Sequence, residues 1–245
     1  MSEVPPSHPR YASLKLREAI VAGVEQGITS LHGLIAHGRG EALDYLIGET
    51  SHPFAIAAVR AGAAMLLRAR HPVISVNGNA AALVAGGLTA LGRLLPAPLE
   101  VNIFHPSKER EEAIAAHLRA QGAEEVLMPT QEAQLSYIES NRRFVHPEGI
   151  FKADVVFVPL EDGDRCQALQ RMGVEVVTVD LNPLSRTARA ASVAIVDNLA
   201  RAMPLLLQAV AQLRQDPPAS WQERIASYHH DTILRAAEAR IRSGA

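Results

Sequence analysis

From residue 72 onward, short runs of β-branched and aliphatic residues alternate with stretches of helical periodicity. The apolar runs, which we expect to form strands, lie at 73–76, 99–103, 125–127, 154–158, 174–179 and 193–196. Between them, the periodicity predicts helices near 79–92, 107–121, 131–143, 163–172 and 198–214. This alternation is typical of a parallel sheet covered by crossover helices. We therefore predict an α/β, Rossmann-like fold: a mostly parallel sheet of about six strands with flanking helices.

The segments on either side of this alternation have helical periodicity alone. Up to about residue 70, apolar side chains recur three and four residues apart, which predicts three or four short helices. After Asp216-Pro217-Pro218, a final helix is expected over 219–243. We therefore divide the chain into an N-terminal helical region (1–70), a Rossmann-like α/β core (71–215) and a C-terminal helix (216–245), which together should form one compact unit.

Charge and cysteine content exclude several classes of protein. The 24 basic and 26 acidic side chains leave a net charge of -2, which provides no overall field to hold nucleic acid. Cys166 is the single cysteine, so an internal disulfide and a four-sulfur zinc site are both excluded. The N-terminus has no apolar leader segment, and no apolar run reaches the roughly 20 residues of a membrane span. We expect a cytoplasmic protein that binds neither nucleic acid nor membrane.

Polar loops follow several of the expected strands, at the sheet edge where parallel sheets bind their ligands. The loops are Asn77-Gly78-Asn79, 159–165, 180–187 and Asp197-Asn198, and the second strand likewise runs into Phe104-His105-Pro106. Each alone fits an ordinary turn or helix cap, but together they favour a ligand site. Within the third loop, Arg186 is flanked by hydroxyl side chains, a grouping suited to phosphate.

A second polar cluster, His37-Gly38-Arg39-Gly40-Glu41, lies in the N-terminal region. Its glycines would let the backbone approach a ligand while Arg39 binds an anion, although the same letters fit an ordinary helix break. Arg17 lies on an amphipathic helix, and its spacing alone assigns it to a solvated face.

Several cofactor motifs are missing. Neither Gly-Lys-Ser nor Gly-Lys-Thr occurs, which excludes a P-loop. Gly38-Arg39-Gly40 lacks both the third glycine and the preceding strand of a dinucleotide fingerprint. The histidines form no His-Glu-x-x-His pair, and Cys166 follows acidic residues, which favours a packed, unreactive thiol.

Taken together, the longer motifs resemble the archaeal-type phosphopantothenate synthetase family, the 4-phosphopantoate–β-alanine ligases. The segments that carry the resemblance are His8-Pro9-Arg10-Tyr11 with Arg17-Glu18, GLIAHGRGEA (33–42), SVNGN (75–79), VPLEDGDR (158–165), DLNPLSRT (180–187) and IVDN (195–198). They occur in the family's order, and the resemblance runs from about residue 8 to 212.

The resemblance implies an ATP-dependent ligase of coenzyme A biosynthesis, with a nucleotide-binding core and a homodimeric assembly. It would join the substrates 4-phosphopantoate and β-alanine through an acyl-adenylate, releasing AMP and diphosphate, with ATP as co-substrate and Mg²⁺ on its phosphates. Carried over onto matching positions, the family's ATP contacts are Arg17, Arg39, Asp180, Leu181, Asn182, Arg186, Thr187, Asn198 and Leu199. For Arg17, only the resemblance indicates this role.

The other substrate needs its own polar groups. We expect phosphopantoate to contact Asn77, Asn79 and Arg142, although Arg142 with Arg143 equally fits a basic helix end that complements the helix dipole. Asp162 and Asp164 are the candidate Mg²⁺ ligands. The sequence identifies no general base.

Two alternatives remain at this stage. One is a nucleotide-binding regulatory protein that performs no chemistry, although it would not need the substrate loops. The other is a Rossmann-like enzyme with another cofactor such as a nicotinamide, which the missing glycine fingerprint disfavours.

Overall fold

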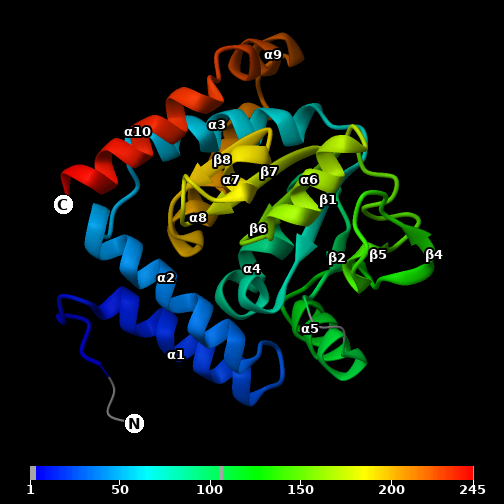
Figure 1. The fold of residues 1–245 in the computed structure, drawn as a ribbon, viewed down its shortest axis with the longest axis horizontal. Helices are drawn as coiled ribbons and strands as arrows, with labels where there is room; N and C mark the ends of the chain where they lie inside the picture. Colours follow the sequence, from blue (N-terminus) through cyan, green and yellow to red (C-terminus); the bar gives the residue numbers. More distant parts are fainter. Residues whose placement is uncertain (1–3, 105–106, 245) are drawn as a thin grey trace.

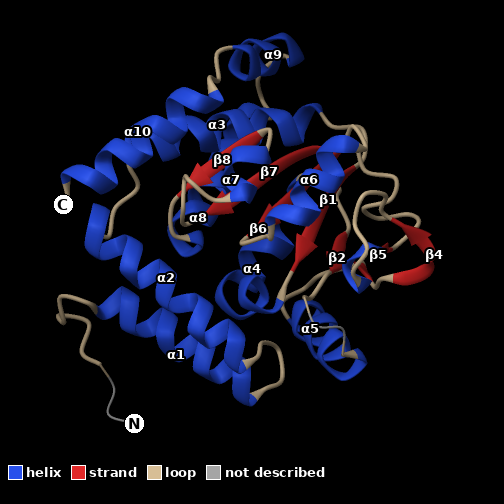
Figure 2. Cartoon of the chain, in the orientation of Figure 1, coloured by secondary structure: helices blue, strands red, loops and turns tan. Residues whose placement is uncertain are grey.

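The structure is a computed structural model that describes residues 4–104 and 107–244. In this part of the chain, six parallel strands form the central sheet in the order β3-β2-β1-β6-β7-β8 (Figures 1 and 2). The strands are β1 (Pro72–Val76), β2 (Leu99–Val101), β3 (Val126–Leu127), β6 (Val155–Pro159), β7 (Glu175–Asp180) and β8 (Val193–Val196). The order reverses direction between β1 and β6, as in doubly wound dinucleotide-binding folds. The predicted α/β class and all the predicted strands are confirmed.

The strands are buried on both faces, which explains their continuous apolar composition. Successive side chains of β1 point to opposite sides: Val73 packs in one core and Ile74 in the other. In register, Ile74 lies between Leu99 of β2 and Phe157 of β6. The sheet therefore separates two apolar cores.

Helices cover both faces of this sheet. The larger core contains residues of α3 (Pro53–Arg68), α4 (Gly78–Leu94), α5 (Lys108–Ala120) and α8 (Leu199–Leu213). The smaller core contains residues of α6 (Gly163–Arg171) and of the loop after α7 (Arg186–Ala190). Because α4, α6 and α8 each begin directly after a strand, their N-termini lie at the carboxyl edge of the sheet.

The helix predicted over 131–143 is wrong. This segment contains β4 (Thr130–Gln134), which pairs antiparallel with β5 (Phe144–Val145), and a short 3-10 turn, η1 (Asn141–Arg143). Ala133 and Leu135 are buried while their neighbours are exposed, so the segment follows a period of two and packs beside the second core. The alternative of a basic α-helix end at Arg142 is therefore wrong as well.

The N-terminal region begins with helices α1 (Tyr11–Glu25) and α2 (Leu31–Ile47), which run side by side (Figure 1). The helix break considered for Gly38-Arg39-Gly40 is not observed, because α2 continues through all three residues. Helix α3 then packs on β6, β7 and β8. The division of the chain near residue 70 stays a prediction.

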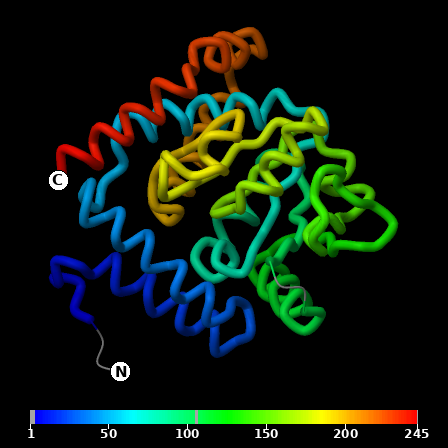
Figure 3. Tube along the Cα trace, in the orientation of Figure 1, coloured from blue at the N-terminus to red at the C-terminus, as the bar shows by residue number. Residues whose placement is uncertain are grey.

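The single helix expected over 219–243 is divided into α9 (Pro218–Ala226) and α10 (His230–Ser243). At the break, the hydroxyl of the half-buried Tyr228 accepts a hydrogen bond from the backbone N–H of Ala194 on the edge strand β8, at 3.2 Å. Helix α10 then runs back along α3 and reaches α2 (Figure 3). None of the helices in the described ranges is long and apolar enough to cross a membrane.

Candidate functional site

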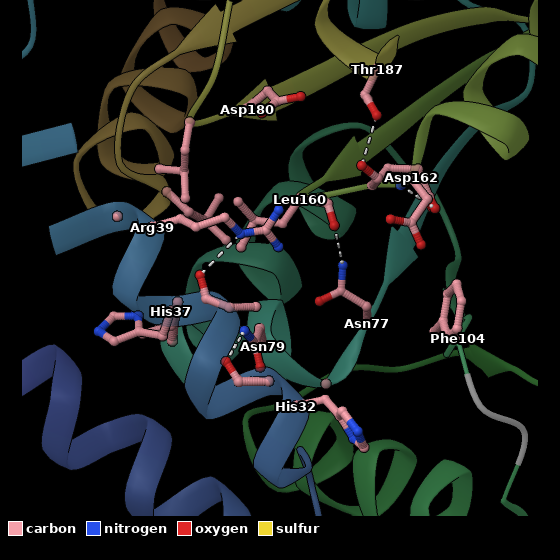
Figure 4. Close-up of a pocket in the computed structure, with 18 of the residues that line it drawn as sticks. His32, His37, Arg39, Asn77, Asn79, Phe104, Leu160, Asp162, Asp180 and Thr187 are labelled. Carbon is pink, nitrogen blue, oxygen red and sulfur yellow. Dashed lines mark hydrogen bonds between the residues drawn. The ribbon is translucent and has the colours of Figure 1, made fainter. Parts of the chain in front are cut away.

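A cleft of about 820 Å³ lies at the carboxyl edge of the sheet. The loops that follow β1, β2, β6, β7 and β8 line it, together with residues of α2 (Figure 4). It therefore includes the point between β1 and β6 where the strand order reverses, which is where doubly wound folds bind ligands. The first residues of α4, α6 and α8 also line it, so these helices direct free backbone N–H groups toward this edge.

The structure brings most of the candidate residues together in this cleft. Of the nine candidate ATP contacts, eight line it within the described ranges: Arg39, Asp180, Leu181, Asn182, Arg186, Thr187, Asn198 and Leu199. Asn77, Asn79, Arg142 and Asp162 also line it. Arg17 and Asp164 are not among the described lining residues.

Arg17 instead connects α1 to α2. Its guanidinium donates Nε to Oε1 of Glu41 at 2.9 Å and Nη2 to Oε2 at 2.6 Å. Arg10 donates to the same carboxylate at 3.0 Å. The hydrogen bonds and charges of these two arginines hold the pKa of Glu41 below its usual value. The contact of Arg17 with ATP stays a prediction.

Asp180, at the end of β7, arranges the loop that follows it. Its carboxylate accepts the backbone N–H of Asn182 at 3.0 Å and the hydroxyl of Ser185, which caps α7. Burial raises the pKa of Asp180 even though these hydrogen bonds, and the charge of Arg39, oppose the rise. The loop is thus held by the same carboxylate that faces the cleft.

The loop after β6 is held in a strained shape by other candidate residues. Leu160 has φ +56°, a conformation that costs energy in a residue with a side chain. The Asn77 amide donates to the carbonyls of Pro159 and Leu160, at 2.8 and 3.3 Å. The Thr187 hydroxyl donates to the carbonyl of Glu161 at 2.8 Å (Figure 4). Asn77 and Thr187 therefore fix one wall of the cleft.

Asn79 has a similar internal role. Its Oδ1 accepts the hydroxyl of Thr29 at 2.6 Å, and its Nδ2 donates to the carbonyl of Gly33 at 2.9 Å (Figure 4). These bonds attach the start of α2 to the start of α4. Both ends of the Asn79 amide are thus used within the protein. The backbone N–H groups at the start of α4 are therefore better placed to bind a ligand than the Asn79 side chain.

Arg142 also lines the cleft, where it lies among carboxylates. Its Nη1 is 2.9 Å from Asp162 and 3.0 Å from Asp164, and its Nη2 pairs with Glu161. Glu161 also pairs with the fully buried Arg165, at 3.0 Å. Burial, followed by the charge of Arg165, lowers the pKa of Arg142. Arg142 must therefore exchange a carboxylate for any phosphate that it binds.

Arg39 and Arg186 are two further arginines that line the cleft. Arg39 extends from α2 into the cleft, and its Nε donates to the carbonyl of Ala36 at 3.4 Å (Figure 4). The guanidinium of Arg186 donates a hydrogen bond to Gln167 at 3.0 Å. Arg186 also packs against the start of α6, because a Cβ added at Gly163 would lie only 2.3 Å from the Cβ of Arg186. Only glycine at position 163 permits this approach.

Sequence reasoning missed several lining residues. They include Asn102, Arg110 and Ile241. Asn102 follows β2, so strand position was a usable signal for it. Phe104, Glu161 and Ser185 lie in loops that the sequence already identified, and they line the cleft as well. His105 and Pro106, in the first of these loops, lie outside the described residues. Ile241 carries no such signal, because it reaches the cleft only through the return of α10 to α2.

Known proteins match this chain over most of its length. Residues 54–244 match the family model described as phosphopantothenate/pantothenate synthetase. A Methanosarcina mazei protein named 4-phosphopantoate–β-alanine ligase is 47% identical over 241 residues, which are 98% of this chain and 95% of that protein. A Thermococcus kodakarensis protein of the same name is 52% identical over 215 residues, 87% of this chain and 82% of that protein. A Methanospirillum hungatei protein, also of that name, is 46% identical over 213 residues, 87% of each chain.

Proposed function

The chain belongs to the phosphopantothenate/pantothenate synthetase family, and from that premise we propose that it is an ATP-dependent 4-phosphopantoate–β-alanine ligase. It joins 4-phosphopantoate to β-alanine and gives 4′-phosphopantothenate, AMP and diphosphate, in coenzyme A biosynthesis. The supporting observation is that several post-strand loops and α2 bring eight candidate ATP contacts to one cleft within the described ranges. Its volume of about 820 Å³ suits small-molecule substrates.

The chemistry runs through an acyl-adenylate, because a free carboxylate is a poor acyl donor. A carboxylate oxygen of 4-phosphopantoate attacks the α-phosphorus of ATP, and the bond from that phosphorus to diphosphate breaks. The neutral amine of β-alanine then attacks the acyl carbon, AMP departs with its electron pair, and the amine loses a proton. Both steps bring anions together, so positioning and charge neutralisation supply most of the acceleration.

The cleft residues have four roles in this reaction. Arg39 and Arg186 neutralise the triphosphate, and Asp180 with Asn182 holds the ribose or adenine. Thr187 and Asn77 act on the loop after β6 through the hydrogen bonds described above. The backbone N–H groups at the start of α4 and the guanidinium of Arg142 receive the phosphate of 4-phosphopantoate.

Mg²⁺ is proposed to neutralise the ATP phosphates, and the acidic loop offers a partial fit for it. Asp162 lines the cleft with 54% of its side chain exposed, so one carboxylate can reach an ion on the phosphates. No group of three or more metal-binding side chains occurs in the described ranges, so phosphate and water supply the other ligands. Asp164 is the second candidate. Both carboxylates pair with Arg142, with which the ion competes.

We also propose that the enzyme works as a homodimer in the cytoplasm. Exposed apolar side chains on α2, among them Leu31 and Ile35, support the dimer. The lone thiol of Cys166 is fully buried, and burial raises its pKa to about 12, which is consistent with a protein that does not use disulfides.

Product analysis tests the proposed reaction. The protein is incubated with ATP, Mg²⁺, 4-phosphopantoate and β-alanine, and the nucleotide products are separated. AMP that appears only when both acids are present supports the ligase. Formation of ADP in place of AMP would indicate an acyl-phosphate intermediate and not an acyl-adenylate. ATP binding without turnover would favour a regulatory protein, and nicotinamide binding would favour a different Rossmann-like enzyme.

Arg186→Ala tests the nucleotide site within the same assay. Loss of the guanidinium should lower kcat/KM for ATP by about 100-fold or more, the effect typical of removing a charge-stabilising group. Arg189→Ala is the matched control, because Arg189 is an exposed arginine of the same short helix and does not line the cleft. Unchanged kcat/KM for ATP in Arg186→Ala would remove this residue from the site.

A further inference from the structure

A network of charged side chains joins α2 to the start of α8, beside the loop that follows β8. Arg201 of α8 donates Nη2 to Oδ1 of Asp44 on α2 at 2.7 Å. Its Nε also donates to Asp197 at 3.0 Å, and the hydroxyl of Ser51 donates to the other oxygen of Asp197. The side chains of Asp44 and Asp197 are 8% and 1% exposed, so the network is shielded from water. Buried charged pairs of this kind resist separation.

The network also reaches a candidate ATP contact directly. Nδ2 of Asn198 lies 3.4 Å from Oδ2 of Asp44, while Oδ1 of Asn198 caps α8 by accepting the N–H of Ala200 at 3.1 Å. Asp44 therefore holds one end of the Asn198 amide and the helix holds the other. This fixes the direction in which the amide faces the cleft.

Helix α2 packs closely at the same place. A Cβ on Gly40 would lie 3.4 Å from Nδ2 of Asn198 and 3.7 Å from a methyl group of Leu181. The backbone of α2 is thus in contact with two candidate ATP contacts, one turn before Asp44. Since Arg39 is adjacent to Gly40, the seating of α2 on α8 also sets where Arg39 enters the cleft.

We propose that Asp44 and Arg201 are positioning residues of the nucleotide site, a role that rests on the proposed function. Among the described residues that line the cleft, neither Asp44 nor Arg201 occurs, so these two act through Asn198 and Arg39. Their ion pair seats α2 against α8, and this places Asn198 and Arg39 on the same nucleotide. Burial alone would lower the pKa of Arg201, but its hydrogen bond to Asp44 and the charges of Asp197 and Asp44 raise it, so Arg201 stays a cation within the network.

Asp44→Asn tests this role because it removes the charge and keeps the size of the side chain. The readout is the Kd for ATP, measured by calorimetry on the complete protein with Mg²⁺ and without the other substrates. We expect Kd to rise about 10-fold, the equivalent of roughly 1.4 kcal/mol. In turnover, KM for ATP should rise by a similar factor, while KM for β-alanine stays within about twofold.

Glu175→Gln is the matched control. Glu175 forms an interelement pair with Arg68 at the start of β7, at the opposite edge of the sheet from the cleft. This variant loses an ion pair between a helix and a strand, although a more exposed one, with side chains 30% and 38% exposed, and it should keep the wild-type Kd for ATP. If Asp44→Asn does not fold, Arg201→Lys keeps the charge and loses the planar fork, and it should weaken ATP binding as well.

The outcomes separate the positioning role from the ligase proposal. An unchanged Kd for ATP in a folded Asp44→Asn protein overturns the positioning role, as does an equal rise in Glu175→Gln. Failure of the wild-type protein to form AMP contradicts the ligase proposal instead, because the binding measurement does not depend on which acid is activated.

Discussion

His37 is a buried titratable residue of α2 whose charged form is disfavoured by folding. Its side chain is buried, and its Nε2 atom has no hydrogen-bond partner among the described residues. Burial lowers the pKa of His37, and the charge of Arg17 adds to this, while the charges of Glu41 and Asp44 oppose it. A histidine with a lowered pKa in the folded state stabilises the protein above its unfolded pKa of about 6.5, and that stability is lost as the pH falls further.

The residue-scale prediction is therefore a loss of thermal stability in mild acid that depends on His37. The wild-type Tm should fall between about pH 6.5 and pH 5, because protonating the unfolded chain becomes progressively more favourable. In His37→Gln the Tm should fall less over the same interval, as measured by differential scanning fluorimetry. His229→Gln, at an exposed position, serves as the control. Parallel Tm curves for wild type and His37→Gln would contradict the assignment.

The sequence located the cleft residues better than it described their contacts. Asn77, Asn79 and Thr187 were correctly placed at the sheet edge, because the strand pattern determines which loops meet there. Their hydrogen-bond partners could not be found in this way. Asn77 contacts the carbonyl of Pro159, 82 residues along the chain, and Asn79 contacts Gly33, 46 residues before it. Every residue has a backbone carbonyl, so the residue types do not show which carbonyl will accept the hydrogen bond.

Helix α2 provides the prediction at the scale of one element. A Cβ at Gly33 would lie 2.2 Å from Oγ1 of Thr29 and 2.3 Å from Oδ1 of Asn79, the atoms that attach α2 to α4. Gly33→Ala should therefore lower the free energy of unfolding by about 1–3 kcal/mol through overpacking. Gly38→Ala on the same helix has nothing within 4 Å and should raise it by up to about 1 kcal/mol, because alanine favours helix.

Urea denaturation of the two variants measures this difference directly. If the free energy of unfolding falls in Gly33→Ala and rises in Gly38→Ala, the close packing at Gly33 outweighs the helix propensity of alanine. Stabilisation by both substitutions would show that propensity alone governs α2 and that the Thr29–Asn79 contact adjusts freely.

Elements were predictable where local pattern and packing agree. The strands of the sheet are continuous apolar runs, so period and burial gave the same answer. Over 131–143, the many helix-forming residues favoured the wrong prediction of a helix over the weaker alternation at Ala133 and Leu135. In the structure, pairing with Val145 makes the start of this segment a strand. The break before α10 depends on Tyr228 meeting β8, a contact that no local pattern specifies.

For the whole molecule, α2 presents an apolar surface that the chain itself does not cover. Leu31 and Ile35 are 66% and 77% exposed, and Tyr45 is 65% exposed. Helical spacing puts these three side chains on a common side of α2. Large exposed apolar side chains gathered on one helix are typical of protein interfaces. We propose this side of α2 as the contact between two copies of the chain, which would place Arg39 of each copy near the interface.

Ile35→Glu tests the assembly. The wild-type protein should elute as a dimer, with a mass by light scattering of about twice the 26.4 kDa of one chain. A carboxylate at position 35 would be buried without a partner in the dimer, so the variant should be a folded monomer. Phe151→Glu is the control, since Phe151 is 50% exposed and lies just before β6, away from α2. A wild-type monomer, or a dimer that survives Ile35→Glu, would exclude this face, whereas a monomer that keeps its affinity for ATP would show that each nucleotide site is complete within one chain.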